Sequence, residues 1–96
     1  MYHKIVSGEL GGTVSAAAMP DIGGLVVMFK AAYDNAGRVY IGGAGVTKAD
    51  GTTDVTTGIQ LSAGETFGWV PFTTLKNFYY ICDNAGDDLT YMIMKL

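Results

Sequence analysis

Apolar residues along this chain come in short runs separated by clusters of Gly, Asp and Asn, and a helical spacing of apolar residues is hard to find. The runs are rich in β-branched and aromatic residues, which is typical of strands between tight turns. We therefore expect strands at residues 2–6, 12–18, 24–32, 38–42, 57–62, 65–70, 76–82 and 89–95, although the alanines within 12–19 also allow a short helix. About eight strands predict an all-β fold, a small antiparallel β-sandwich of jelly-roll type.

Several predicted strands are apolar on both faces. In 24–32, Val26 and Met28 alternate with Val27 and Phe29, and in 89–95 the methionines alternate with Leu, Tyr and Ile. A half-exposed strand alternates apolar with polar residues instead. Because a domain this small cannot cover both faces of its strands alone, we expect other copies of the chain to cover the second face.

The segment "FGWVPF" at 67–72 is the most binding-like stretch of the chain. Its aromatic side chains suit an anchor in a protein interface or a platform for a sugar ring. They also suit a role in capping the core at a sheet edge, and both interpretations stay open at this point. With the second-face residues, they complete a candidate interface: Val26, Met28, Trp69, Phe72, Met92, Met94 and Leu96.

The tetrapeptide Asp-Asn-Ala-Gly occurs twice, at 34–37 and 83–86, each time directly after an apolar run. Asp and Asn favour turns, and a glycine in the left-handed region closes a common hairpin connection. We therefore predict two β-hairpins, in which Gly37 and Gly86 have positive φ.

Composition narrows the classes of partner. The chain has 96 residues, of which 49% are hydrophobic and 16% charged, so we expect a single domain over residues 1–96 with more apolar surface than one small core hides. Its six Lys and Arg residues are scattered and its net charge is −3, which argues against nucleic acid as a partner. The longest apolar run, 25–29, is too short to span a membrane. Without a recognisable signal peptide, we expect synthesis in a cytoplasm.

Candidate chemistry is sparse. The only histidine, His3, has no partner at nucleophile or metal-ligand spacing, so we expect no enzyme, no catalytic residue, no metal and no cofactor. The loop "DNAGDD" at 83–88 is read either as a plain turn or as a Ca²⁺ loop without EF-hand spacing. "GGAG" at 42–45 precedes no helical segment, so a flexible turn explains it better than a phosphate-binding loop. The single cysteine, Cys82, excludes an internal disulfide and is expected to be a small buried side chain.

Three segments carry a resemblance to a known family: "VYIGGAGVT" from Val39 to Thr47, "LSAGE" from Leu61 to Glu65, and Phe78 to Gly86. Over roughly its C-terminal two-thirds, the chain resembles small tailed-phage virion proteins of the head decoration (cement) type. "KADGTTDVTTG" at 48–58 is longer and richer in Thr than that pattern and is expected to form a tip loop. The resemblance implies a structural protein on the capsid surface of the virion, bound to the major capsid protein as an oligomer, often a homotrimer.

The function expected from the sequence is therefore that of a capsid decoration subunit, which is made in the host cytoplasm, associates with itself and binds the assembled head. The alternative is a carbohydrate-binding or host-attachment module of a phage fibre or tail, which would use Trp69 and Phe72.

Overall fold

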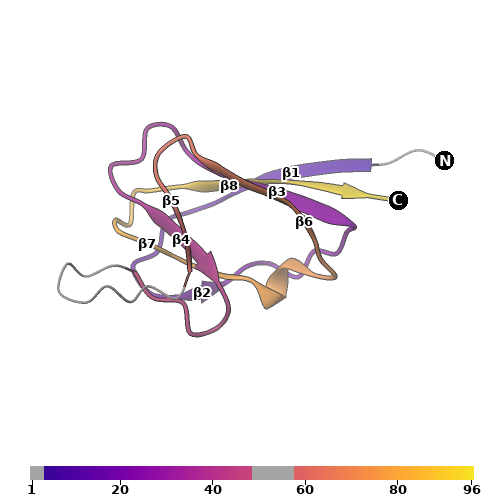
Figure 1. Ribbon diagram of the computed structural model, residues 1–96, viewed down its shortest axis with the longest axis horizontal. Helices are drawn as coiled ribbons and strands as arrows, with labels where there is room; N and C mark the ends of the chain where they lie inside the picture. Colours follow the sequence, from indigo (N-terminus) through magenta and orange to yellow (C-terminus); the bar gives the residue numbers. More distant parts are fainter. Residues whose placement is uncertain (1–3, 49–57) are drawn as a thin grey trace.

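Two four-stranded antiparallel sheets pack face to face in the computed structural model, which describes residues 4–48 and 58–96 (Figure 1). The first sheet has the order β1-β8-β3-β6, with bounds Lys4–Leu10, Leu89–Lys95, Val26–Ala31 and Thr66–Pro71. The second has the order β2-β7-β4-β5, with bounds Ala17–Ala18, Tyr79–Cys82, Val39–Gly42 and Ile59–Leu61. A 3-10 turn, η1 (Leu75–Asn77), precedes β7.

The predicted fold class is confirmed: the fold is all-β and antiparallel, and its strand order is consistent with a jelly roll. Each predicted segment contains a strand, but 12–18 provides only the two residues of β2, and 76–82 begins within η1. β1 runs to Leu10, beyond the predicted end at residue 6. Within the described ranges, no helix has the length and hydropathy to cross a membrane.

The core lies between the sheets and follows the alternation read from the sequence. Val27 and Phe29 of β3 and Ile93 of β8 are fully buried on the inner side of the first sheet. They meet β4 and β7 side chains, including Ile41 and Cys82, from the second sheet. Each large apolar side chain buried in this way contributes about 1.5–3 kcal/mol relative to exposure.

The outward side of the second sheet is covered by the chain itself. Tyr40 of β4 and Ile81 of β7 are buried there in a small cluster with Val46, which follows β4, and Tyr79 packs against them. The Val46 N–H donates to the carbonyl of Gly43 and closes the turn that brings Val46 over the sheet. For β7, the expectation that only another copy covers the second apolar face is therefore wrong.

The prediction of two hairpins at the repeated tetrapeptide is also wrong. β3 and β4 lie in different sheets, as do β7 and β8, so each Asp-Asn-Ala-Gly segment crosses from one sheet to the other. Among the described glycines, only Gly64 and Gly68 have positive φ, and Gly37 and Gly86 do not. The local turn chemistry was recognised correctly, but the flanking strands pair elsewhere: β3 with β6 and β8, and β7 with β2 and β4.

The two crossings pack against each other. The side-chain amide of Asn35 donates to the carbonyl of Asp88 (2.9 Å), and the Asp88 N–H donates back to Oδ1 of Asn35 (2.8 Å). The Arg38 N–H donates to Oδ2 of Asp83 (2.9 Å), whose Oδ1 accepts from the Tyr40 hydroxyl (3.1 Å). Asn35 and Asp83, one from each tetrapeptide, therefore tie the two crossings together.

Candidate functional site

The face of the β1-β8-β3-β6 sheet that points away from the core is the candidate functional site. Strand register places its side chains in three rows that run across β1, β8 and β3. We call the following residues the outer face: Ile5, Met94 and Val26 in the first row, Ser7, Met92 and Met28 in the second, and Glu9, Thr90 and Lys30 in the third. Two rows are therefore mainly apolar, and the third holds one carboxylate and one amine.

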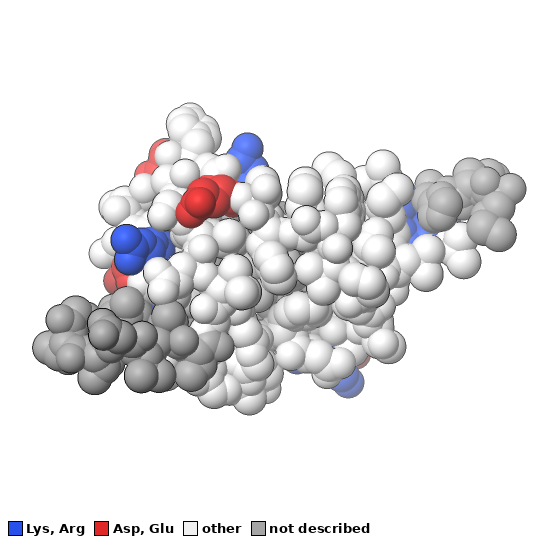
Figure 2. Space-filling view, in the orientation of Figure 1, with Lys and Arg blue, Asp and Glu red and all other residues white. Residues whose placement is uncertain are grey.

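No other segment of the described chain covers these rows as Val46 covers the second sheet. Ile5 is 62% exposed and Met92 is 37% exposed, whereas Val26, Met28 and Met94 are half-buried by their neighbours in the sheet. In the view of Figure 2, most charged side chains lie toward one end of the molecule, a few lie at its other end and lower edge, and uncharged residues cover the area between them. The exposed apolar side chains of the first two rows make this face the candidate interaction surface.

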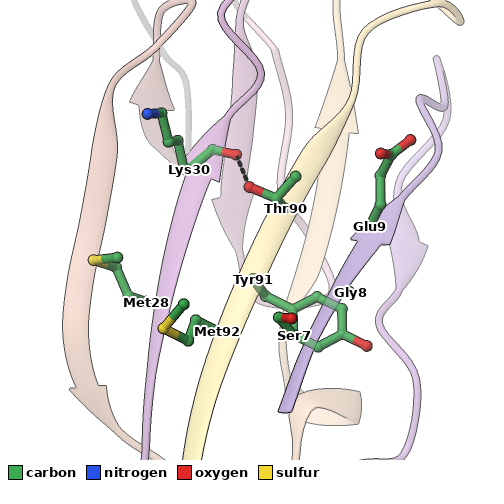
Figure 3. A pocket seen from close by; sticks show the side chains of 8 residues that line it. All are labelled: Ser7, Gly8, Glu9, Met28, Lys30, Thr90, Tyr91 and Met92. Carbon is green, nitrogen blue, oxygen red and sulfur yellow. Dashed lines mark hydrogen bonds between the residues drawn. The ribbon is translucent and has the colours of Figure 1, made fainter. Parts of the chain in front are cut away.

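An open hollow of about 440 Å³ lies over β8 in this face, between β1 and β3 (Figure 3). Met28 and Met92 lie next to each other at one end, and Glu9 and Lys30 lie on opposite sides of Thr90 at the other. The Thr90 hydroxyl donates to the carbonyl of Lys30 (3.1 Å), which fixes the middle of the charged row. The hollow therefore combines a flexible apolar floor with two charges of opposite sign two strands apart.

β6 extends the apolar surface past β3. Pro71 lies opposite Val26 in register, and the register of β6 shifts between Val27 and Phe29, so that Gly68 and Trp69 together oppose Met28. Trp69 is 45% exposed. A Cβ on Gly68 would lie 2.8 Å from the Cα of Met28, so the glycine allows β6 to approach β3 closely beside Trp69.

The structure brings four of the seven predicted interface residues together, since Val26, Met28, Met92 and Met94 are neighbours on the outer face. Leu96 follows β8 and is 61% exposed. Trp69 and Phe72 are separated: Trp69 is exposed, whereas Phe72 is half-buried against the core, with its ring centroid 6.4 Å from that of Phe78.

Sequence reasoning missed the contribution of β1. The predicted strand ended before Ser7 and Glu9, although the alternation of Ile5, Ser7 and Glu9 with Val6 and Leu10 is visible in the sequence. A weak but regular period of two was the available signal. Because polar residues occupy many positions of this strand, its apolar content is low, and its C-terminal half was not predicted.

The other candidate residues either have structural roles or lie outside the described part of the chain. His3 and the loop residues 49–57 lie outside it. In "DNAGDD", the buried carboxylate of Asp87 accepts N–H groups at both oxygens. No group of three or more His, Cys, Asp and Glu side chains suited to a metal ion lies within 4–48 and 58–96.

Cys82 is fully buried, as expected for a small apolar side chain. Burial raises the pKa of its thiol, a backbone hydrogen bond with Thr13 opposes this, and the nearby Asp87 and Asp83 carboxylates raise the pKa further. Burial also raises the pKa of the neighbouring Tyr80, whose hydroxyl donates to the carbonyl of Gly11 (2.7 Å). At neutral pH both groups are therefore protonated parts of the core.

Comparison with protein-family models, with curated proteins and with solved structures gave no match to this chain.

Proposed function

We propose that this protein is a non-enzymatic virion structural subunit of the capsid decoration type, which associates with itself and binds the assembled head through the major capsid protein. Two independent observations support the proposal. The segments Val39 to Thr47, Leu61 to Glu65 and Phe78 to Gly86 resemble that family, which favours three copies per oligomer. The apolar rows of the outer face carry the self-association, since this surface lacks cover from the described chain.

The energetics suit a subunit that acts in many copies. Covering a Met, Val or Ile side chain gains at most about 1.5–3 kcal/mol, while association costs about 4–15 kcal/mol in lost freedom. A face with five apolar side chains, Ile5, Val26, Met28, Met92 and Met94, therefore supports modest association. Repeated modest contacts on a particle surface raise the overall affinity through effective concentration.

The direct test is the location of the protein in purified particles. Particles from the virus whose genome carries this gene are probed with an antibody against the purified chain. Labelling over the head, in a fixed ratio to the major capsid protein, is the expected result. Labelling confined to the tail or fibres would favour the attachment module, and no labelling at all would refute a virion role.

The attachment module is the second candidate because Trp69 is 45% exposed on β6. A flat exposed indole is a suitable stacking surface for a sugar ring. Titration of an oligosaccharide panel against the wild-type chain and against Trp69→Ala separates the two functions. Binding that is lost in Trp69→Ala supports attachment, and a panel without any binding supports decoration.

A further inference from the structure

We propose that the outer face is occupied by a second copy of this chain, related by a two-fold axis that runs parallel to the strands over β8. In this arrangement Glu9 of each copy lies opposite the partner's Lys30. The inference rests on the proposed self-association. It specifies a dimer contact, whereas the resemblance favours three copies.

The direction of the axis follows from the rows. A rotation about an axis parallel to the strands keeps every row opposite itself, so apolar rows meet apolar rows and the charged row meets the charged row. An axis across the strands would instead lay Glu9 and Lys30 over the partner's first row, which contains Ile5, Met94 and Val26. That contact would bury both charges without a partner, which is strongly unfavourable.

The position of the axis follows from the two charges. Glu9 lies on β1 and Lys30 on β3, one strand to either side of β8. An axis over β3 would oppose Lys30 to the partner's Lys30, and an axis over β1 would oppose the two Glu9 carboxylates. An axis midway between β8 and β3 would place Lys30 opposite a threonine. Of these positions, the one over β8 forms two Glu9–Lys30 pairs, and such charge complementarity sets the register of an interface.

The shape of the face fits the same axis. In the second row, the small Ser7 of one copy lies opposite the partner's Met28, and the hollow of about 440 Å³ between β1 and β3 receives that side chain. Packed sheets lie about 10 Å apart, a gap that two interdigitating layers of side chains fill. Methionine adapts well to such a gap because its unbranched chain is flexible.

The contact is small. Three strands about 4.8 Å apart, with about five residues of 3.4 Å each, cover only a few hundred Å² per copy. Interfaces of this size belong to the weak end of specific association. Association is therefore expected to be weak, and the oligomeric state must be measured over a wide range of concentrations at low salt.

The first test is a charge exchange on the full chain, followed by sedimentation velocity. Glu9→Lys and Lys30→Glu each set like charges opposite one another and are expected to raise the dimer dissociation constant about tenfold or more. The double variant E9K/K30E restores opposite charges and is expected to return close to the wild-type value. Both side chains are exposed, so circular dichroism should show the same fold in all variants.

The second test locates the axis. Met92 lies next to the partner's Met92 in this arrangement, so Met92→Cys should be linked into dimers by a short bismaleimide, since a spacing of about 10 Å exceeds the reach of a disulfide. Cys82 is buried and does not compete. Ile59→Cys, an exposed position on β5 of the other sheet, is the matched control and should stay unlinked.

Dimers whose charge variants are rescued by the double exchange, together with linkage of the Met92→Cys variant, support the inference. Four results would overturn it. The wild-type chain could be a monomer at high concentration, or it could be a trimer. The single charge variants could associate like the wild type, or the Met92→Cys variant could be linked no better than the control. The outcome is distinct from that for the proposed function. A chain found on capsids without this pairing keeps its proposed role in decoration but not the pairing through the outer face, and a chain that pairs but is absent from particles loses the decoration role.

Discussion

Among the described residues, one side chain of a charged type is buried: that of Asp87, with 2% of its surface exposed. Its Oδ1 accepts the N–H groups of Ala36 (2.9 Å) and Gly37 (3.3 Å) from the first crossing. Its Oδ2 accepts the backbone and side-chain N–H groups of Asn84 (both 3.2 Å) from the second. A buried carboxylate is tolerated only when it is hydrogen-bonded in this way. Asp87 therefore joins the two crossings, in addition to the hydrogen bonds made by Asn35 and Asp83.

Asp87→Asn is expected to destabilise the protein by about 2 kcal/mol or more, because an amide replaces one accepting oxygen with a donor that faces other donors. Urea unfolding measures the loss. The matched control is Asp34→Asn in the first crossing, where the side chain is exposed, and this change should have little effect. Equal stability of the two variants would contradict the role assigned to Asp87.

Gly37 and Gly86 occupy the same place in the repeated tetrapeptide but have different surroundings. A Cβ on Gly37 would lie 2.6 Å from the Cβ of Asp83 and 2.8 Å from Nδ2 of Asn84, whereas a Cβ on Gly86 has no neighbour within 4 Å. Gly37→Ala should therefore cost about 1–3 kcal/mol through overpacking, and Gly86→Ala should be nearly neutral. Chemical denaturation of both variants checks this, and a larger loss for Gly86→Ala would refute it.

Residue chemistry alone predicted the turns but not this difference. Asp, Asn and Gly favour turns wherever they occur, so both copies of the tetrapeptide led to the same expectation. A glycine is needed at position 37 because the backbone there lies close to the second tetrapeptide, at 83–86. This is a tertiary contact between segments distant in sequence. No local signal in either copy reports that contact.

At the scale of elements, two buried titratable side chains of β7, Tyr80 and Cys82, make the stability of the fold depend on pH. The pKa values of Cys82 and Tyr80 are both raised in the folded protein, mainly by burial, from ordinary values of 9.0 and 10.0. Above those ordinary values, the unfolded chain releases protons that the folded chain keeps. Stability is therefore full below pH 9 and falls as the pH rises.

The unfolding free energy is expected to decrease above about pH 9, by at most about 1.4 kcal/mol per pH unit for each group. Denaturant titrations at a series of alkaline pH values measure the slope. Cys82→Ala should flatten the part that begins near pH 9, and Tyr80→Phe the part that begins near pH 10. A slope that neither variant changes would assign the effect to other groups.

The sequence predicted the buried and outward faces of β3 and β8 correctly, but it misjudged what covers β7. Alternation within β3 and β8 correctly assigned Val27, Phe29 and Ile93 to the core and Val26, Met28 and Met92 to the other side, because side-chain direction in a strand has a strict period of two. The same pattern in β7 misled, since Val46 from a loop covers that strand. Periodicity shows that a face is apolar but does not identify what covers it.

The described part of the chain measures 50 × 26 × 17 Å, and the outer face lies on the sheet that contains β1 and β8. Sequence patterns predicted the fold class and four of the nine residues of this face. They did not predict the strand order, which brings β1 beside β8 and places Glu9 and Lys30 on either side of Thr90. That order arises from pairing between distant segments, which composition and local period do not encode.

The proposed self-association predicts a melting temperature that depends on concentration, because a partner that binds only the folded chain stabilises it by mass action. Over a hundredfold range of concentration, the wild-type melting temperature should rise by about 5 °C, since 1 kcal/mol corresponds to about 4–8 °C for a domain of this size. Differential scanning calorimetry measures the rise. Glu9→Lys should show much less of it, and an equal rise in both proteins would assign association to another surface.

The position of β8 has a consequence during synthesis. β8 follows the other seven described strands in sequence, yet it lies between β1 and β3, which precede most of them. Until the ribosome has released residues 89–95, β1 lacks its partner, and the rows of the outer face lack Met92, Met94 and Thr90. Pairing between segments so distant in sequence forms late. In the proposed pairing, a nascent chain that still lacks β8 therefore has no finished outer face for a second copy, and pairing follows the synthesis of β8.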